Sequence, residues 1–282
     1  MNILEIEKLC KNYKNFTLDN VSFNLPEGAI MGLIGENGAG KSTIINLITG
    51  AVQKNGGNIK IFGKPQENLT DEDHACIGTV LSGCGFPEEM TVGMAERVMR
   101  GMYKNWDSSA FLKYAADFQL PLKKKIRTLS TGMKMRLEIA AALSHNARLL
   151  ILDEVTNGLD PAARMDVLDM LLDFIQDERR SVIISSHIVG DLEKICDYIT
   201  FIHQGKIVFS ENKDDLLEEY AIINIDDAQL KELDETAVIA VNKTSCTQTA
   251  LVLKNKIPGT FECEKAGIED IMVYYIKRSD KA

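Results

Sequence analysis

The residues whose types and spacing most clearly indicate a chemical function run from Gly35 to Thr43. They read Gly35-Glu36-Asn37-Gly38-Ala39-Gly40-Lys41-Ser42-Thr43, which matches the G-x-x-x-x-G-K-[ST] spacing of a nucleotide phosphate-binding loop. The three glycines allow the backbone to curl until successive N–H groups face one anion. We therefore expect the polyphosphate of a nucleotide to bind here.

Two side chains of this loop have predicted roles of their own. Lys41 supplies a positive charge for the β- and γ-phosphates, and the Ser42 hydroxyl can ligate Mg²⁺. The alternative is a glycine-rich turn that contains a lysine by chance. An apolar run at 29–34 precedes the loop and an amphipathic run at 43–49 follows it, which is the strand–loop–helix order that phosphate binding requires.

Two carboxylates end the most apolar stretch of the chain. Residues 149–152 are apolar, and Asp153 and Glu154 follow them. A continuous apolar run is typical of a buried strand in a parallel sheet, and ligands gather where such strands end. One carboxylate can hold Mg²⁺ and the other can orient a water for attack on phosphorus. Alternatively, the two acids cap the next turn.

Four further residues have both a functional and a structural interpretation. His187 follows the β-rich run 181–185, where its imidazole can donate to a γ-phosphate oxygen, although a lone histidine is usually structural. Tyr13 lies in a polar turn and can stack on adenine, or it is a half-buried surface tyrosine. Ser130 and Gly132 open an amphipathic helix over about 132–144, which is either an anion site or only a capped helix.

The remaining pattern alternates strands and helices and indicates a wound α/β core. We expect strands, antiparallel at first and leading into the loop, at 3–6, 16–23, 29–34, 59–63, 77–81, 198–203 and 206–209. Helices are expected at 91–120 with a break before Asp107 or Ser108, at 161–177 and at 191–197. A methionine-containing stripe (Val92, Ala95, Val98, Met99 and Met102) is expected to pack in the core.

Beyond residue 220 the pattern changes to short strands and a terminal helix at 267–278, with no catalytic cluster. We therefore divide the chain into a main domain at 1–220, whose helical part spans about 84–142, and a small α+β appendage at 221–282. The simplest interpretation is that the appendage only stabilises the protein.

The composition excludes several classes of protein. The 282 residues are 45% apolar and 26% charged, with a net charge of −9 and no long basic block, so we expect no nucleic-acid partner. No secretion signal or bilayer-spanning run is recognisable. Six cysteines without a C-x-x-C pair predict free thiols rather than disulfides or zinc ligands. Contact with a membrane must therefore come through a partner.

Taken together and in this order, these motifs resemble those of the ATP-binding subunits of ABC transporters, over roughly residues 1–220. The loop at 35–42 resembles the family's phosphate loop, and Leu129 to Met133 (LSTGM) resembles its signature LSGGQ. Leu149 to Glu154 resembles the Walker B strand with the catalytic glutamate. Gly158-Leu159-Asp160 resembles the D-loop, His187 the switch histidine, and Tyr13 the adenine-stacking aromatic. Within the family, the chain is most similar to single-domain subunits of bacterial exporters.

The resemblance implies a fold, a mechanism and partners. The fold is that of an ABC-type P-loop ATPase, with an antiparallel β subdomain, a RecA-like core and a helical signature subdomain. Two chains, identical or not, face head to tail and bind ATP and Mg²⁺ between the phosphate loop of one and the signature of the other. The catalytic residues are Glu154, His187 and Lys41, while Ser42, Asp153 and Ser82 serve the metal. The complex drives a polytopic membrane subunit from the cytoplasmic face of the cell membrane. The resemblance also implies which residues bind the nucleotide: Tyr13, Gly35, Asn37, Gly38, Ala39, Gly40, Lys41, Ser42, Thr43, Ser130, Gly132 and Asp160.

The sequence departs from the family's pattern at four positions in three places. Ser82 stands where the family has a glutamine, and its shorter side chain reaches the metal only through water or a loop movement. The signature carries Thr131 for its first glycine and ends in Met133 instead of glutamine. Val155 replaces the usual proline after the catalytic glutamate, which would loosen that loop. These departures predict an active but slow ATPase.

Two other functions would produce similar motifs. One is a soluble ABC-type assembly ATPase that acts on cytosolic protein partners and moves no solute. The other is a subunit that senses ATP without hydrolysing it, which Ser82 favours and Glu154 and His187 oppose. Neither the transported substrate nor the direction of transport is encoded in a recognisable motif of this chain.

Overall fold

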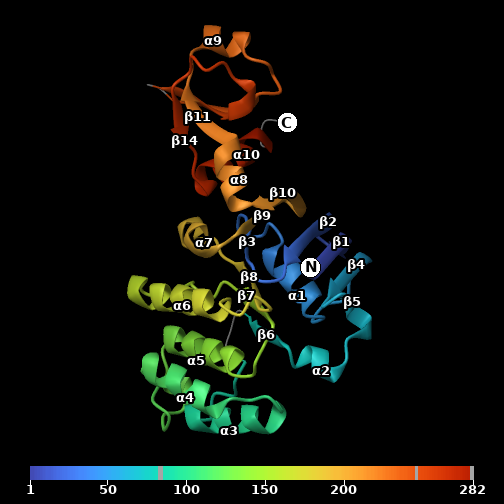
Figure 1. The fold of residues 1–282 in the computed structure, drawn as a ribbon, viewed down its shortest axis with the longest axis vertical. Helices are drawn as coiled ribbons and strands as arrows, with labels where there is room; N and C mark the ends of the chain where they lie inside the picture. Colours follow the sequence, from blue (N-terminus) through green and yellow to red (C-terminus); the bar gives the residue numbers. More distant parts are fainter. Residues whose placement is uncertain (82–84, 245–246, 280–282) are drawn as a thin grey trace.

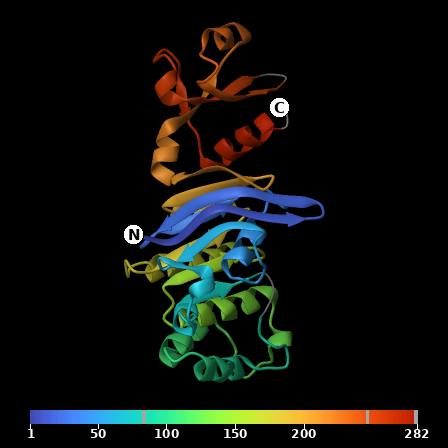
Figure 2. The ribbon, with the colours of Figure 1, turned by 90° about the vertical axis from the view of Figure 1, so that its right-hand side faces the viewer.

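The computed structural model describes residues 1–81, 85–244 and 247–279. They form a central sheet of six strands between two smaller sheets of four strands each. The helices α3 to α5 and the C-terminal elements lie at opposite ends of the long axis, with the central sheet between them (Figures 1 and 2). The predicted α/β fold, with an antiparallel N-terminal sheet beside a mainly parallel core sheet, is confirmed.

The central sheet has the strand order β10-β9-β3-β8-β7-β6 and is parallel except for β10. Every residue of β3, β7 and β8 is buried, because helices and the N-terminal sheet cover both faces. The run at 29–34 was predicted to be antiparallel, which is wrong: its continuous burial suits a parallel strand. The strands are β3 (Ile30–Ile34), β6 (Ile77–Val80), β7 (Leu149–Asp153), β8 (Ser181–Ser185), β9 (Tyr198–His203) and β10 (Lys206–Asn212).

The N-terminal sheet is antiparallel, with the order β2-β1-β4-β5. Its inner face and the central sheet enclose a hydrophobic core that includes Leu4, Leu25 and Met31 and receives the apolar face of α1 (Lys41–Ile48). This packing fixes the helix that follows the phosphate loop. The other elements here are β1 (Asn2–Tyr13), β2 (Phe16–Pro26), β4 (Gly56–Ile61), β5 (Lys64–Pro65) and α2 (Asp71–His74).

Helices cover the other face of the central sheet and form the lower end of the molecule in Figure 1. Asp107 and Ser130 cap α4 and α5, as the sequence predicted, because their side chains accept backbone N–H bonds. The prediction that the stripe on α3 packs in the core is partly wrong: Val98 is 40% exposed and Met102 is 71% exposed. The helices are α3 (Val92–Met102), α4 (Ser108–Asp117), α5 (Thr131–Leu143), α6 (Pro161–Phe174) and α7 (Val189–Ile195).

The C-terminal sheet has the order β12-β13-β11-β14 and its own small hydrophobic cluster. It contacts the core through α10, whose Tyr275 ring lies 5.9 Å from Phe209 and whose hydroxyl is 2.8 Å from that of Tyr220. The sequence analysis missed α8, α9 and β14, which are short. The elements are α8 (Lys213–Glu219), β11 (Tyr220–Asn224), α9 (Asp227–Glu232), β12 (Val238–Lys243), β13 (Gln248–Leu253), β14 (Cys263–Lys265) and α10 (Ile268–Ser279).

Two predictions from composition concern the whole chain. Within the described ranges, no helix combines the length and hydropathy that a bilayer crossing needs. The described cysteines, Cys10, Cys76, Cys196 and Cys263, are free thiols, as predicted. Cys84 and Cys246 lie outside the described residues.

Candidate functional site

The phosphate loop crosses from β3 to α1 in a conformation that requires glycine at two positions. A Cβ at Gly35 would lie 2.3 Å from the Ile202 carbonyl oxygen, a contact no side chain tolerates. Gly40, at the start of α1, has φ +119° and would place a Cβ 2.9 Å from the Phe16 ring. The loop therefore lies directly against strand β9 on one side and against Phe16 on the other.

Lys41 is buried at the base of the loop. Its ammonium donates to the carbonyl oxygens of Gly35 (2.8 Å) and Glu36 (3.2 Å) and lies 3.6 Å from Glu154 Oε1. The lysine side chain is only 5% exposed. A buried ammonium needs such oxygen partners because desolvation without them is costly. The lysine and the glutamate, far apart in sequence, are in direct contact here.

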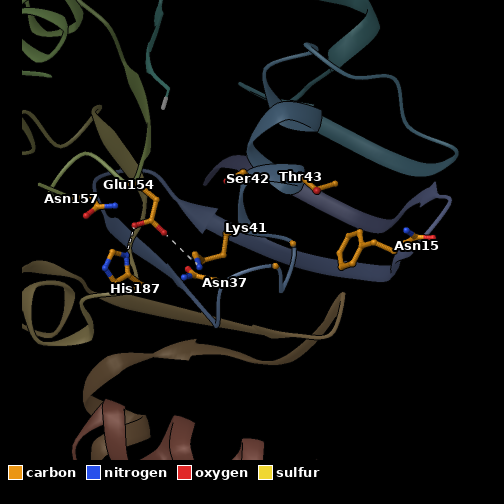
Figure 3. Close-up of a pocket in the computed structure, with 11 residues that line it drawn as sticks. Asn15, Asn37, Lys41, Ser42, Thr43, Glu154, Asn157 and His187 are labelled. Carbon is orange, nitrogen blue, oxygen red and sulfur yellow. Dashed lines mark hydrogen bonds and ion pairs between the residues drawn. The ribbon is translucent and has the colours of Figure 1, made fainter. Parts of the chain in front are cut away.

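The carboxyl end of β7 places the two predicted carboxylates in different surroundings. Asp153 is buried, and its Oδ1 accepts a 2.5 Å hydrogen bond from Ser185 Oγ of the neighbouring strand β8. Glu154 has φ +55°, an uncommon backbone conformation for a non-glycine residue. Its N–H donates to Ser185, and its Oε2 is 2.7 Å from His187 Nδ1 (Figure 3). Ser185, which the sequence analysis did not single out, thus fixes both acids.

Lys41, Glu154 and His187 line one cleft of about 740 Å³, whereas Asp153 is buried behind it and does not line it. Figure 3 shows Glu154 between Lys41 and His187, with Ser42 and Thr43 on the adjoining helix α1. The cleft brings together the predicted loop residues Asn37, Gly38, Gly40, Lys41, Ser42 and Thr43 with Glu154 and His187, and it adds the unpredicted Asn15, Phe16 and Asn157.

Tyr13 lies beside this cleft but does not line it. Its ring is 45% exposed and its centroid is 6.5 Å from that of Phe16, which forms the wall. The sequence offered little signal for Phe16, because its place at the start of a strand also fits ordinary core packing. Gly35 and Ala39 contribute backbone to the loop: the Ala39 N–H donates to Glu36 O, and Ala39 O accepts from Gly205 N–H.

Two predicted residues carry the oxygen ligands that Mg²⁺ prefers, and of these two only Ser42 lines the cleft. Hard oxygen ligands are available from the Ser42 hydroxyl and the Asp153 carboxylate, which Ser185 holds in place. No cluster of three or more histidine, cysteine or acidic side chains suited to a metal occurs within the described part of the chain. Ser82, the third predicted metal residue, lies outside the described residues.

The signature residues do not line this cleft. Ser130 is exposed at the start of α5, where its hydroxyl accepts from Met133 N–H (3.2 Å). Gly132 lies against Leu159, since a Cβ there would be 3.2 Å from its Cδ2 atom. Asp160 caps α6, and the Ala163 N–H, which is the main cause, holds the pKa of its carboxyl below the ordinary value. One chain therefore carries two separate groups of predicted site residues.

Comparison with known proteins identifies the group to which this arrangement belongs. A family model described as ABC transporter matches residues 18–157. The lantibiotic transport ATP-binding protein SrtF of Streptococcus pyogenes is 35% identical over 214 residues, which cover 75% of this chain and 92% of that protein. The chain belongs to the ABC transporter family. Within it the chain is an ATP-binding subunit, an ATPase that energises transport.

Two further comparisons show how far the likeness to ABC proteins extends. The uncharacterized ABC transporter ATP-binding protein YhcH of Bacillus subtilis (strain 168) is 29% identical over 290 residues, covering 98% of this chain and 91% of that protein. A solved ATP-binding subunit of an ABC transporter superposes with a TM-score of 0.67 at 26% identity, covering 76% of this chain and 91% of the other. The similarity to YhcH therefore includes the C-terminal elements.

Proposed function

We propose that two copies of this chain, or this chain and a related one, bind two molecules of MgATP between them and hydrolyse them to drive a membrane partner. The observation that carries the proposal is the meeting of Lys41, Glu154 and His187 in one cleft beside Ser42. These are a cation for phosphate, a carboxylate for water and an imidazole, placed at the mouth of a helix.

Each side chain has a separate task in this proposal. Lys41 exchanges its carbonyl partners and Glu154 for the β- and γ-phosphates. Ser42 and Asp153 hold Mg²⁺, which neutralises phosphate charge when bound. Glu154, once released by Lys41, polarises the attacking water, and His187, 2.7 Å away, orients the glutamate and donates to the γ-phosphate. Phe16 and Tyr13 pack against the nucleoside.

The second group of residues completes the site of the opposite chain. Ser130 and Thr131, at the start of α5, are exposed, so a partner's γ-phosphate can reach this end of the helix. Gly132 permits close backbone approach, and Asp160 lies at the same surface, with its Oδ2 atom 4.0 Å from Arg136. Head-to-tail pairing is favoured because neither group forms a full phosphate site alone.

A membrane subunit is the proposed partner, and through it the chain lies on the cytoplasmic face of the cell membrane. Met94, Val98 and Met102 repeat every four residues on α3 and are 40%, 40% and 71% exposed. The stripe ends at a hollow of about 490 Å³ lined by Met102, Tyr103 and His145. An exposed apolar stripe that continues into a hollow suits a partner's helix, and methionine adapts well to such contacts.

We also propose that the chain divides at residue 220 into an ATPase domain and a C-terminal appendage.

The decisive test is Glu154→Gln. We expect the variant to bind MgATP, to accumulate as a dimer and to hydrolyse ATP about 10²- to 10⁴-fold more slowly, because the amide cannot accept the proton of the attacking water. Size-exclusion chromatography with light scattering gives the dimer fraction, and phosphate release gives the rate.

Glu235→Gln, an exposed glutamate before β12, is the matched control and should behave as the wild type. Wild-type turnover by Glu154→Gln would remove the assigned role. A strictly monomeric Glu154→Gln protein with ATP bound would remove the proposed dimer, and failure to co-purify with a membrane protein in native extracts would favour a cytosolic assembly role.

A further inference from the structure

A serine at the end of strand β8 lies between the two halves of the site. Strand β8 runs between β3 and β7 in the central sheet, and its last residue, Ser185, pairs with Leu33 on one side and with Asp153 on the other. The phosphate loop follows β3, and the two acids lie where β7 ends. Ser185 is fully buried, so it can influence the cleft only through the residues that it contacts.

The Ser185 hydroxyl makes two hydrogen bonds to the end of β7. It donates to Asp153 Oδ1 (2.5 Å) and accepts from the Glu154 N–H (3.1 Å). The same N–H also donates to the Ser185 carbonyl oxygen (3.1 Å). A short bond is expected of a hydroxyl that donates to a charged oxygen. This one hydroxyl therefore holds the side chain of one acid and the backbone of the other.

The backbone of Glu154 needs such support. Its φ of +55° is uncommon for a residue other than glycine and persists where neighbouring contacts hold it. Ser185 holds its N–H, and the Asn157 N–H donates to its carbonyl oxygen (3.1 Å). With the backbone held in this way, the Glu154 carboxylate lies in the cleft between Lys41 and His187 (Figure 3).

The histidine that contacts Glu154 is attached to the same end of β8. His187 follows Ser185 by two residues, and the intervening Ser186 is buried. The Ser186 hydroxyl accepts from the Ile188 N–H (3.0 Å), which fixes the turn that carries the imidazole. Both partners of the 2.7 Å contact between Glu154 Oε2 and His187 Nδ1 are therefore held by the last residues of one strand segment.

Another serine of β8 provides a structural comparison. Ser181 lies four residues earlier, on the same face of the strand, and is equally buried. Its hydroxyl accepts from the Gly28 N–H (2.9 Å) and donates to the Pro26 carbonyl oxygen (3.2 Å). The two serines thus match in burial and in number of hydrogen bonds, but Ser181 bonds to the end of β2 and the turn after it, and Ser185 bonds to the acids of the site.

We propose that Ser185 is a positioning residue for ATP hydrolysis, which acts by holding Glu154 in the conformation that presents its carboxylate to the attacking water. Because the hydroxyl donates its own proton to Asp153, its oxygen stays oriented toward the Glu154 N–H. Loss of the hydroxyl leaves the carbonyl bond to this N–H in place, but it removes the second bond and takes a donor from the buried Asp153 carboxylate. The inference rests on the proposed role of Glu154 in polarising water.

The test compares Ser185→Ala with Ser181→Ala, a control that also removes one buried hydroxyl from β8. We expect Ser185→Ala to lower kcat about 3- to 10-fold, the effect of losing one hydrogen bond to a catalytic group, and to leave KM and the ATP Kd unchanged. Ser181→Ala should keep the wild-type kcat. Phosphate release gives kcat and KM, and isothermal titration gives Kd. An equal fall in kcat for both variants, or a loss of ATP affinity in Ser185→Ala, would overturn the inference.

A double-mutant cycle determines whether Ser185 acts through Glu154. In the Glu154→Gln background, Ser185→Ala should lower the residual single-turnover rate no further, because the carboxylate that it positions is already absent. A second loss of the full size would contradict the proposal.

Should Ser185→Ala fail to fold, Ser185→Cys decides, because it keeps a side chain of similar shape but only a weak donor. It must show the same selective fall in kcat, and a wild-type kcat would reject the positioning role. Wild-type turnover by Glu154→Gln would instead refute the proposed role of the glutamate itself.

Discussion

Lys41 and Ser130 are both predicted to contact phosphate, yet they differ in burial and in the number of their polar partners. Lys41 is 5% exposed, and three oxygen atoms lie within 3.6 Å of its ammonium. Ser130 is exposed, and in the described structure its hydroxyl makes a single hydrogen bond, within its own helix cap. The phosphate loop thus has its polar contacts within one chain, whereas the signature segment is exposed and open to contact by another molecule. The proposed function therefore assigns the signature segment to a site that a partner chain completes.

Because Lys41 is enclosed in the loop of its own chain, we expect its substitution to lower ATP affinity more than any substitution in the signature segment. Lys41→Ala removes charge-assisted contacts to phosphate, each of which is worth about 1.5–3 kcal/mol, so ATP should bind roughly 10- to 100-fold more weakly. Isothermal titration of the monomer measures the change, and Lys231→Ala on α9 is the control. Unchanged affinity would mean that the loop's backbone alone binds the polyphosphate.

In the signature segment, we expect a single substitution to abolish dimerisation without changing the affinity for ATP. Ser130→Asp keeps an acceptor for the cap of α5, so the helix should remain stable, but its charge repels a partner's γ-phosphate. In the Glu154→Gln background the variant should bind ATP normally and fail to dimerise. Light scattering checks the assembly and titration checks the affinity. A stable ATP-bound dimer of this double variant would place the opposing contact elsewhere.

The last prediction concerns folding stability rather than nucleotide binding, and it involves the buried side of the same signature helix. Burial, the main cause, raises the pKa of Glu138 in α5 to about 7, although a hydrogen bond from Gly85 N–H opposes it. The ordinary value is 4.5, so between pH 4.5 and 7 the folded protein keeps a proton that the unfolded chain has lost. The free energy of unfolding should therefore fall as pH rises through this window, by at most about 3 kcal/mol.

Glu138→Gln isolates this contribution, since its side chain still accepts from Gly85 and cannot ionise. Urea unfolding from pH 4.5 to 8 should show the variant gaining stability relative to the wild type until about pH 7, with a constant difference above it. Other titrating groups cancel in the comparison. A difference that does not change with pH would mean that Glu138 is ionised in the folded protein at all these values.

Much of the core fold was accessible from the sequence because its signals are local. The buried strands β7 and β8 are continuous apolar runs, and the caps at Asp107 and Ser130 are single residues with known preferences. The short C-terminal elements were missed: α9 has only six residues, none of them buried, so no helical period of apolar residues marks it in the sequence. Phe16 was missed because strand burial and a cleft wall look alike in sequence.

The sequence by itself determined the loop from Gly35 to Thr43, the two acids after β7 and the order of the motifs, because each depends on the backbone geometry of a few adjacent residues. Tertiary structure alone decided that Lys41 meets Glu154, that Ser185 bonds to both acids, and that the Gly205 N–H donates to Ala39 O of the loop. Those contacts join residues of different strands and loops. The physical reason is that the order of strands in a sheet is set by the packing of the whole core, which no local pattern contains.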